Sequence, residues 1–255
     1  MKKIISILGL LSAMLLSTNA LAADTIKIGT EGAYAPFNSV DAQGNLIGFD
    51  IEIGNALCAA MNAECEWVTS GWDGIIPALL AKKFDAIIAS MSITEERKQK
   101  ISFSEKYYTS PVKFARIKGT SFEITAAELK GKYVAVQSST VTENFVRGAF
   151  PEAKIKAYKT QEEANLDFIA GRVDVVAADS FVLYDFLEST QGQQAEAVGP
   201  DFDDVQYLGE GIGIGVRKDD TDLVNKLNAA IKKIRADGTY QKINDKYFNF
   251  DVYGS

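Results

Sequence analysis

Short apolar runs rich in β-branched residues alternate with amphipathic stretches along most of the chain, and no other feature constrains its fold as strongly. We expect strands at residues 26–29, 65–69, 84–90, 112–117, 133–137, 153–158 and 173–178. Strands that alternate with helical patterns are typical of βαβ units, in which helices join parallel strands. The sequence therefore predicts an α/β fold, and its 255 residues are enough for one large or two medium domains.

Two distant segments share one pattern, LLAKKFDAIIAS at 79–90 and FIAGRVDVVAAD at 168–179. Each reads as the end of a helix, a basic residue, and a buried strand that ends in a polar residue. The carboxyl ends of parallel strands are where α/β sheets place ligands, so Ser90 and Asp179 are candidate site residues by position. The alternative is a chance resemblance between two common turns.

Helices are predicted in the stretches between these strands. Asp50 is a plausible N-cap for a helix at 51–61, which would bury Ile51 and Leu57. A second helix is predicted at 72–83, with Pro77 tolerated in its first turn, and a third at 160–170.

The last fifth of the chain contains three further predicted features. Residues 205–208 are expected to form a short strand. The alternating glycines of 211–215 are expected to form a strand that either allows close backbone approach or crosses between lobes. A dinucleotide-binding loop is the alternative for these glycines, but no helix-opening turn follows them. Residues 223–248 are predicted as two helices broken near 237–238.

The N-terminus has the pattern of a secretory signal peptide. Lys2 and Lys3 precede an apolar run at 4–16, and the small-residue triplet 20–22 follows a short polar patch. The apolar run is shorter than the ~20 residues of a membrane-spanning helix, although an N-terminal anchor is the alternative. We expect cleavage after Ala22 and export of the mature chain.

Export predicts the oxidation state of the two cysteines. Cys58 and Cys65 would lie in an oxidising compartment, where a pair of thiols tends to form a disulfide. Such a bond would join the helix at 51–61 to the strand at 65–69. Two buried free thiols are the alternative.

Composition excludes several classes of function. The chain contains no histidine and two cysteines, which excludes Ser-His-Asp and Cys-His nucleophile systems, His-ligated zinc and thiolate-rich metal sites. We therefore expect no metal and no cofactor. The formal net charge is -7 and no cationic cluster suits a phosphate backbone, so nucleic-acid binding is also excluded.

Five motifs follow one another along the chain. They are GTEGAYAPF at 29–37, GFDIEI at 48–53, WDGIIPAL at 72–79, SMSITEER at 90–97 and DGTY at 237–240. Together with the paired cysteines, this order resembles the periplasmic solute-binding proteins of polar amino-acid ABC transporters. The lysine/arginine/ornithine- and histidine-binding group and the arginine/ornithine binders are most similar. The resemblance covers nearly the whole chain after the leader.

The resemblance implies two α/β lobes, joined by two crossovers, that close over one amino acid. The first lobe is expected at 23–110 and 211–255 and the second at 111–210, with crossings near 112–117 and 209–215. The implied protein is a monomeric periplasmic receptor without a cofactor. It would bind a basic L-amino acid of the arginine, ornithine or lysine class and deliver it to an ABC transporter permease.

The resemblance also implies which residues hold the backbone of the amino acid. Arg97 is expected to hold the α-carboxylate through its guanidinium fork, with help from Ser92 and from Thr140 at the start of a helix at 140–150. Asp179 and Ser90 are expected to accept hydrogen bonds from the α-ammonium group.

Three more implied residues surround the ligand side chain. Glu31 would meet its distal cation, and Tyr34 and Trp72 would sandwich it between two rings. Many relatives carry Asp in place of Glu31, and serine often replaces Ala89. These departures leave the ranking of arginine, ornithine, lysine, histidine and opines open.

Other functions share the implied fold. The ligand could be histidine or an opine, the receptor could serve a chemoreceptor, and some periplasmic dehydratases resemble recruited binding proteins. An enzyme needs a cleft acid or base that is free for proton transfer. Because each implied cleft carboxylate faces a cation, the sequence favours a binding protein over an enzyme.

Overall fold

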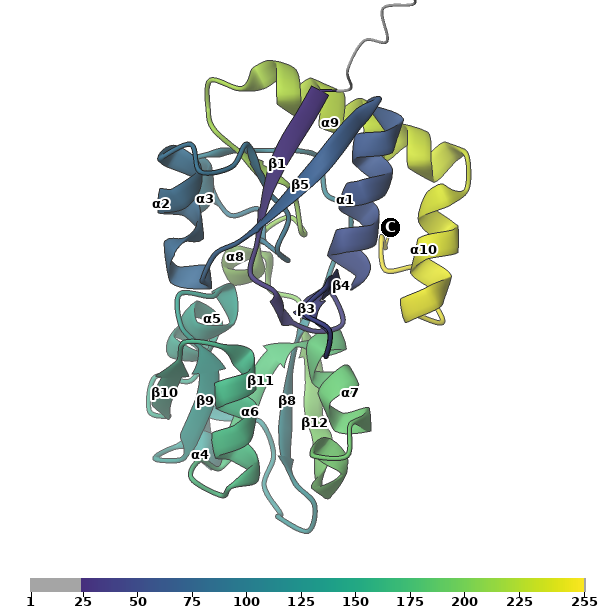
Figure 1. Cartoon of the computed structure of the whole chain (residues 1–255). Helices are drawn as coiled ribbons and strands as arrows, with labels where there is room; N and C mark the ends of the chain where they lie inside the picture. Colours follow the sequence, from purple (N-terminus) through teal and green to yellow (C-terminus); the bar gives the residue numbers. More distant parts are fainter. Residues whose placement is uncertain (1–23, 255) are drawn as a thin grey trace, which may run out of the picture.

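A computed structural model describes residues 24–254, so the leader predicted at 1–22 and its cleavage after Ala22 lie outside the described residues. The described chain forms two lobes, each an open sheet flanked by helices (Figure 1). Its first strand and its C-terminal helices both belong to the upper lobe in that view. The predicted two-lobed α/β fold is confirmed.

The first lobe is built on a five-stranded sheet with the order β5-β1-β6-β13-β7. These strands are β1 (Asp24–Thr30), β5 (Ala63–Thr69), β6 (Ala86–Ile87), β7 (Ser102–Phe103) and β13 (Gly215–Val216). A small sheet is formed by β2 (Ala33–Tyr34), β3 (Asn38–Val40) and β4 (Leu46–Ile47). The helices are α1 (Phe49–Ala60), η1 (Trp72–Gly74), α2 (Ile75–Leu80), α3 (Glu95–Lys98), α9 (Thr221–Ala236) and α10 (Thr239–Tyr247).

The second lobe has the sheet order β10-β9-β11-β8-β12. Its strands are β8 (Val112–Ile117), β9 (Tyr133–Gln137), β10 (Lys154–Tyr158), β11 (Val175–Asp179) and β12 (Ala195–Phe202). Its helices are α4 (Ala126–Leu129), α5 (Val141–Ala149), α6 (Gln161–Ile169), α7 (Ser180–Glu188), η2 (Gly192–Gln194) and α8 (Val205–Leu208). Strand β11 is buried along its whole length, as its run of small and β-branched residues requires.

Threonine caps begin three helices of the second lobe. The side chains of Thr125, Thr140 and Thr160 each accept a hydrogen bond from the backbone N–H of a glutamate three residues later. This T-x-x-E pattern is the capping-box signature and satisfies an N–H group that has no partner within the helix. The N-terminus of α5 is thereby fixed at Thr140, as predicted.

The start of α1 differs from the prediction that Asp50 caps it. Gly48 is the N-cap, with a φ of 124° and no room for a side chain, since an added Cβ would lie 2.3 Å from the Phe37 carbonyl oxygen. The Phe49 and Asp50 N–H groups donate to the carbonyls of Pro36 and Phe37. Because backbone acceptors satisfy the helix start, the buried Asp50 side chain is left for other partners.

Three further predictions need correction. Residues 205–208 form helix α8 and not a strand, because the Asp204 side chain caps them and Gly209 ends them at a φ of 76°. The helix predicted at 72–83 divides into η1 and α2 and ends at Leu80. The strand predicted at 84–90 is shortened to Ala86–Ile87, because the backbone turns at Ser90, which has a φ of 52°.

The crossing predicted near 112–117 is also displaced. Strand β8 occupies these residues and pairs with β11 and β12 inside the second sheet. The two connections between the lobes instead run side by side through 104–111 and 209–214, where Tyr108 and Ile212 form an antiparallel bridge.

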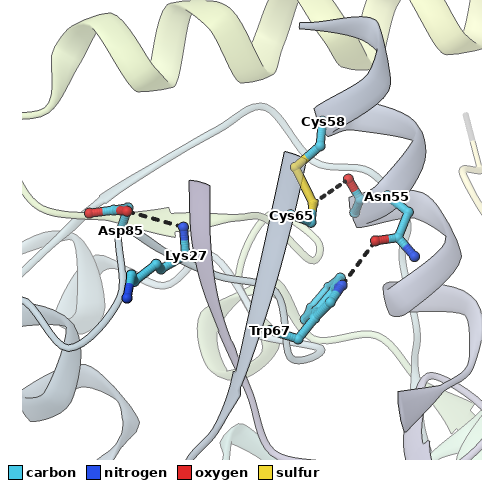
Figure 2. Close-up of a disulfide and its surroundings, with 7 residues drawn as sticks. Lys27, Asn55, Cys58, Cys65, Trp67 and Asp85 are labelled. Atoms are coloured by element: carbon cyan, nitrogen blue, oxygen red, sulfur yellow. Dashed lines mark hydrogen bonds between the residues drawn. A yellow bond between two sulfur atoms is a disulfide. The ribbon is translucent and has the colours of Figure 1, made fainter. Parts of the chain in front are cut away.

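The predicted disulfide between Cys58 and Cys65 is confirmed, with Cα atoms 5.8 Å apart (Figure 2). It joins the end of α1 to β5, and the Trp67 indole N–H donates to the Asn55 side chain at 2.9 Å beside it. On the chain-entropy account, a disulfide that closes a loop this short stabilises the fold by about 2–3 kcal/mol.

Across residues 24–254, no helix combines the length and the apolar character needed to cross a membrane.

Candidate functional site

One cavity between the lobes is lined by all eight of the residues that the sequence singled out for ligand binding. They are Glu31, Tyr34, Trp72, Ser90, Ser92 and Arg97 of the first lobe with Thr140 and Asp179 of the second. Three other lining residues, Ala89, Gln137 and Val141, were not among the predicted ligand contacts.

Arg97 enters the cavity from α3, which begins at the Thr94 cap. Its Nη1 donates to the Ser92 carbonyl oxygen at 3.1 Å, and its guanidinium lies 5.1 Å from the centre of the Trp72 ring. Burial lowers the pKa of Arg97 to about 10, although Glu96 and Asp179 oppose the shift. Arg97 therefore stays charged at neutral pH and can bind a carboxylate through the rest of its fork.

Asp179 ends strand β11 and lies 7% exposed in the wall of the cavity. Burial raises the pKa of this carboxyl to about 7, while the hydrogen bond from the Tyr34 hydroxyl and the charge of Arg97 oppose the rise. The nearby carboxylate of Asp50 raises it further. A cation that entered the cavity would favour the ionised form of Asp179.

Glu31 follows β1 and is held by Gln137 of the opposite lobe, whose amide nitrogen donates to its Oε1 at 2.7 Å. The same nitrogen lies 3.3 Å from the Lys159 carbonyl oxygen, so both of its neighbours are acceptors. Burial raises the pKa of Glu31 to about 7, the Gln137 bond opposes this, and Asp73 adds to it. Glu31 is therefore a second carboxylate that a cation would help to ionise.

Trp72 and Thr140 both lie where the two lobes touch. The Trp72 indole N–H donates to the Ser139 carbonyl oxygen at 3.1 Å, and the Ser138 hydroxyl donates to Asp73 at 3.1 Å. The Thr140 hydroxyl is occupied by its cap and by the Gln137 carbonyl oxygen at 2.8 Å. Thr140 can therefore contribute its backbone N–H, at a helix start that favours anions.

Ser90 and Ser92 lie side by side in the wall that the first lobe contributes. Both are buried, and the carbonyl oxygen of Ser92 is the partner of Arg97. The N–H and O–H groups of Ser90 both donate to Asp50, at 2.9 and 3.1 Å. Ser90 consequently faces the cavity with acceptor atoms.

Gln137 could have been found from the sequence. It is the last residue of strand β9, and the rule that selected Ser90 and Asp179, a polar residue at the carboxyl end of a parallel strand, applies to it equally. Nowhere between Asp24 and Gly254 do three His, Cys, Asp or Glu side chains lie close enough together to hold a metal ion.

Several binding proteins are similar to this chain in sequence or in structure. The L-arginine-binding protein of Pseudomonas aeruginosa is 46% identical, and the lysine/arginine/ornithine-binding periplasmic protein of Escherichia coli 40% identical, over 100% of each chain. A solved Salmonella typhimurium periplasmic binding protein with high arginine specificity has a TM-score of 0.84 and 34% identity over 89% of this chain and 100% of its own. Residues 26–250 match the model of one protein family. The chain therefore belongs to the bacterial extracellular solute-binding proteins, family 3.

Proposed function

We propose that this chain is a periplasmic receptor that binds a basic L-amino acid between its lobes, with arginine as the first candidate, and delivers it to an ABC transporter permease. The proposal rests on the charge of the residues that line the cavity. Glu31 and Asp179 supply two carboxylates and Arg97 one guanidinium, so the ionised cavity has one negative charge in excess. An amino acid with a cationic side chain carries the complementary charge, whereas a neutral one leaves a carboxylate unpaired in a confined site.

Each charge of such a ligand has a partner in this scheme. Arg97 and the N-terminus of α5 bind the α-carboxylate, and Asp179 and Ser90 accept the α-ammonium group. Glu31, held by Gln137, pairs with the distal cation. The names of the relatives from Pseudomonas aeruginosa and Escherichia coli support a ligand of the arginine, lysine and ornithine class.

Binding and release require the lobes to open and close. We propose the lobe boundaries 23–110 with 211–255 and 111–210, which agree with the sheet to which each strand belongs. The paired connections at Tyr108 and Ile212 allow a hinge motion, and a ligand that contacts both lobes stabilises the closed state. We further propose that the receptor works as a monomer.

The raised pKa values of Glu31 and Asp179 also suit a general acid or base, which is the property expected of an enzyme. We assign them to binding, because burial is the main cause of both shifts and each carboxyl can pair with a cation of the ligand. The relatives named above, which are binding proteins, support this assignment.

Native mass spectrometry tests the proposal. The full chain, expressed with its leader, should be exported and lose residues 1–22, and the ligand-stripped protein should bind one arginine per chain. Arginine recovered after a day of incubation should have an unchanged mass. Absence of an arginine complex would contradict receptor function, and a changed mass would indicate an enzyme.

A further inference from the structure

Asp50 is a fully buried carboxylate that does not line the cavity but lies directly behind Ser90, which does. A buried carboxylate is unfavourable unless hydrogen bonds satisfy its oxygen atoms. Since backbone groups satisfy the start of α1, helix capping does not account for Asp50. The hydrogen-bond donors that surround the Asp50 side chain must therefore account for its burial.

Four donors converge on this carboxylate. Its Oδ1 accepts from the Tyr107 hydroxyl at 2.7 Å, and its Oδ2 accepts from the Asn38 amide at 3.0 Å. The same Oδ2 accepts from Ser90 twice, from the backbone N–H at 2.9 Å and from the hydroxyl at 3.1 Å. Half of the hydrogen bonds of Asp50 therefore hold one residue of the cavity wall.

Ser90 needs such support because its backbone φ is 52°, in the left-handed region that residues with a side chain rarely adopt. Unusual backbone conformations persist where their surroundings fix them, and they occur often at functional sites. The two bonds to Asp50 fix both the backbone and the side chain of Ser90.

The direction of these bonds also sets the chemistry of the Ser90 hydroxyl. A serine hydroxyl has one proton to donate and lone pairs to accept. Because the proton points to Asp50, only lone pairs remain for the cavity. An ammonium group is a donor without acceptor capacity, so a hydroxyl fixed in this way is its complement.

We propose that Asp50 is a positioning residue of the binding site, which fixes the Ser90 hydroxyl as an acceptor for the α-ammonium group of the ligand. This inference rests on the proposed function. Asp50 acts through Ser90 and does not touch the ligand.

The test compares L-arginine with 5-guanidinopentanoic acid, which is arginine without its α-amino group. Calorimetry gives Kd for both ligands with the wild type, Asp50→Ala and Asp50→Asn. In Asp50→Ala, the fold loss of affinity for arginine should be about ten times the fold loss for the analogue. This factor corresponds to the free energy that one hydrogen bond to a charged group contributes to binding. Asp50→Asn should restore arginine binding to within about threefold of the wild type, because its amide oxygen can still accept from Ser90.

Asn244→Ala is the matched structural control. Asn244 is also fully buried, and its side chain donates to the Phe250 carbonyl oxygen and accepts from the Val252 N–H, away from the cavity. The Asn244→Ala variant should have a lower melting temperature than the wild type. Its ratio of the Kd for arginine to the Kd for the analogue should be unchanged. If Asp50→Ala does not fold, Ser90→Ala takes its place, since it deletes the hydroxyl and keeps the backbone bond to Asp50.

Three outcomes overturn the inference. Equal losses for arginine and the analogue, in Asp50→Ala or in Ser90→Ala, would give Asp50 a purely structural role. Wild-type arginine affinity in Asp50→Ala would show that Ser90 needs no positioning. A wild type that binds no arginine would overturn the proposed function, and the inference with it.

Discussion

Replacement of Glu31 by glutamine isolates the charge that, in our account, selects a basic ligand. The Gln137 amide nitrogen donates to Glu31 at 2.7 Å and can donate equally to the amide oxygen of Glu31→Gln. The substitution therefore keeps the shape of the cavity and the contact between the lobes. Only the negative charge is lost.

The structure sets the size of the effect. Removing one partner of a buried charge pair raises the binding free energy by about 2–5 kcal/mol. Glu31 is partly exposed, and water can relieve part of the lost pairing, so we take the lower end. A loss of about 2–3 kcal/mol corresponds to a Kd for arginine that is roughly 30- to 150-fold higher.

Calorimetry with arginine and citrulline, its neutral isostere, measures this effect. Citrulline has no distal cation and, in our account, leaves the Glu31 carboxylate unpaired, so Glu31→Gln should not weaken citrulline binding and should instead strengthen it. The reasoning would be refuted if both ligands lost affinity by the same factor, because Glu31 would then act on the fold or on lobe closure. It would also be refuted if arginine binding were unchanged.

Further outcomes follow from the charges and the disulfide. Arg97→Ala should weaken every amino acid ligand by at least about 100-fold, since it removes the partner of the shared carboxylate; retained binding in calorimetry would contradict this role. Arginine should bind more tightly as the pH rises from 5 to 8, because Glu31 and Asp179, whose pKa values are raised to about 7, must release protons to pair with it. The unliganded protein should show the opposite trend in stability, since its folded state holds these protons from about pH 4 to 7 and the unfolded state does not; melting temperatures across this range test the sign. The double variant Cys58→Ser/Cys65→Ser should lose about 2–3 kcal/mol of unfolding free energy in urea while its Kd for arginine stays unchanged, because the disulfide does not line the cavity.

Local patterns made part of the fold predictable from the sequence. The fully buried run of β11 and the Thr140 and Thr160 caps are encoded within a few residues, and the structure has each of them. The break at Gly238, with a φ of 79°, is another local signal that separates α9 from α10.

Features that depend on distant partners could not be predicted. An aspartate before an apolar helix looks like an N-cap, and only the fold reveals that Asp50 binds Ser90, forty positions along the chain. The left-handed backbone of Ser90, which shortens β6, has no signal of its own because serine seldom adopts it. The position of Ser90 in the cavity was nevertheless predictable, since it follows a parallel strand.

Titration calorimetry of the ligand-stripped protein with L-arginine, L-ornithine, L-lysine, L-histidine, L-glutamine and octopine tests the central claim most directly. Our account predicts 1:1 binding of the cationic amino acids and no detectable binding of glutamine, because the cavity carries one excess negative charge. The order of the affinities would then identify the preferred ligand. Binding of glutamine alone, or of none of the six, would contradict the claim that Glu31, Asp179 and Arg97 select a basic amino acid.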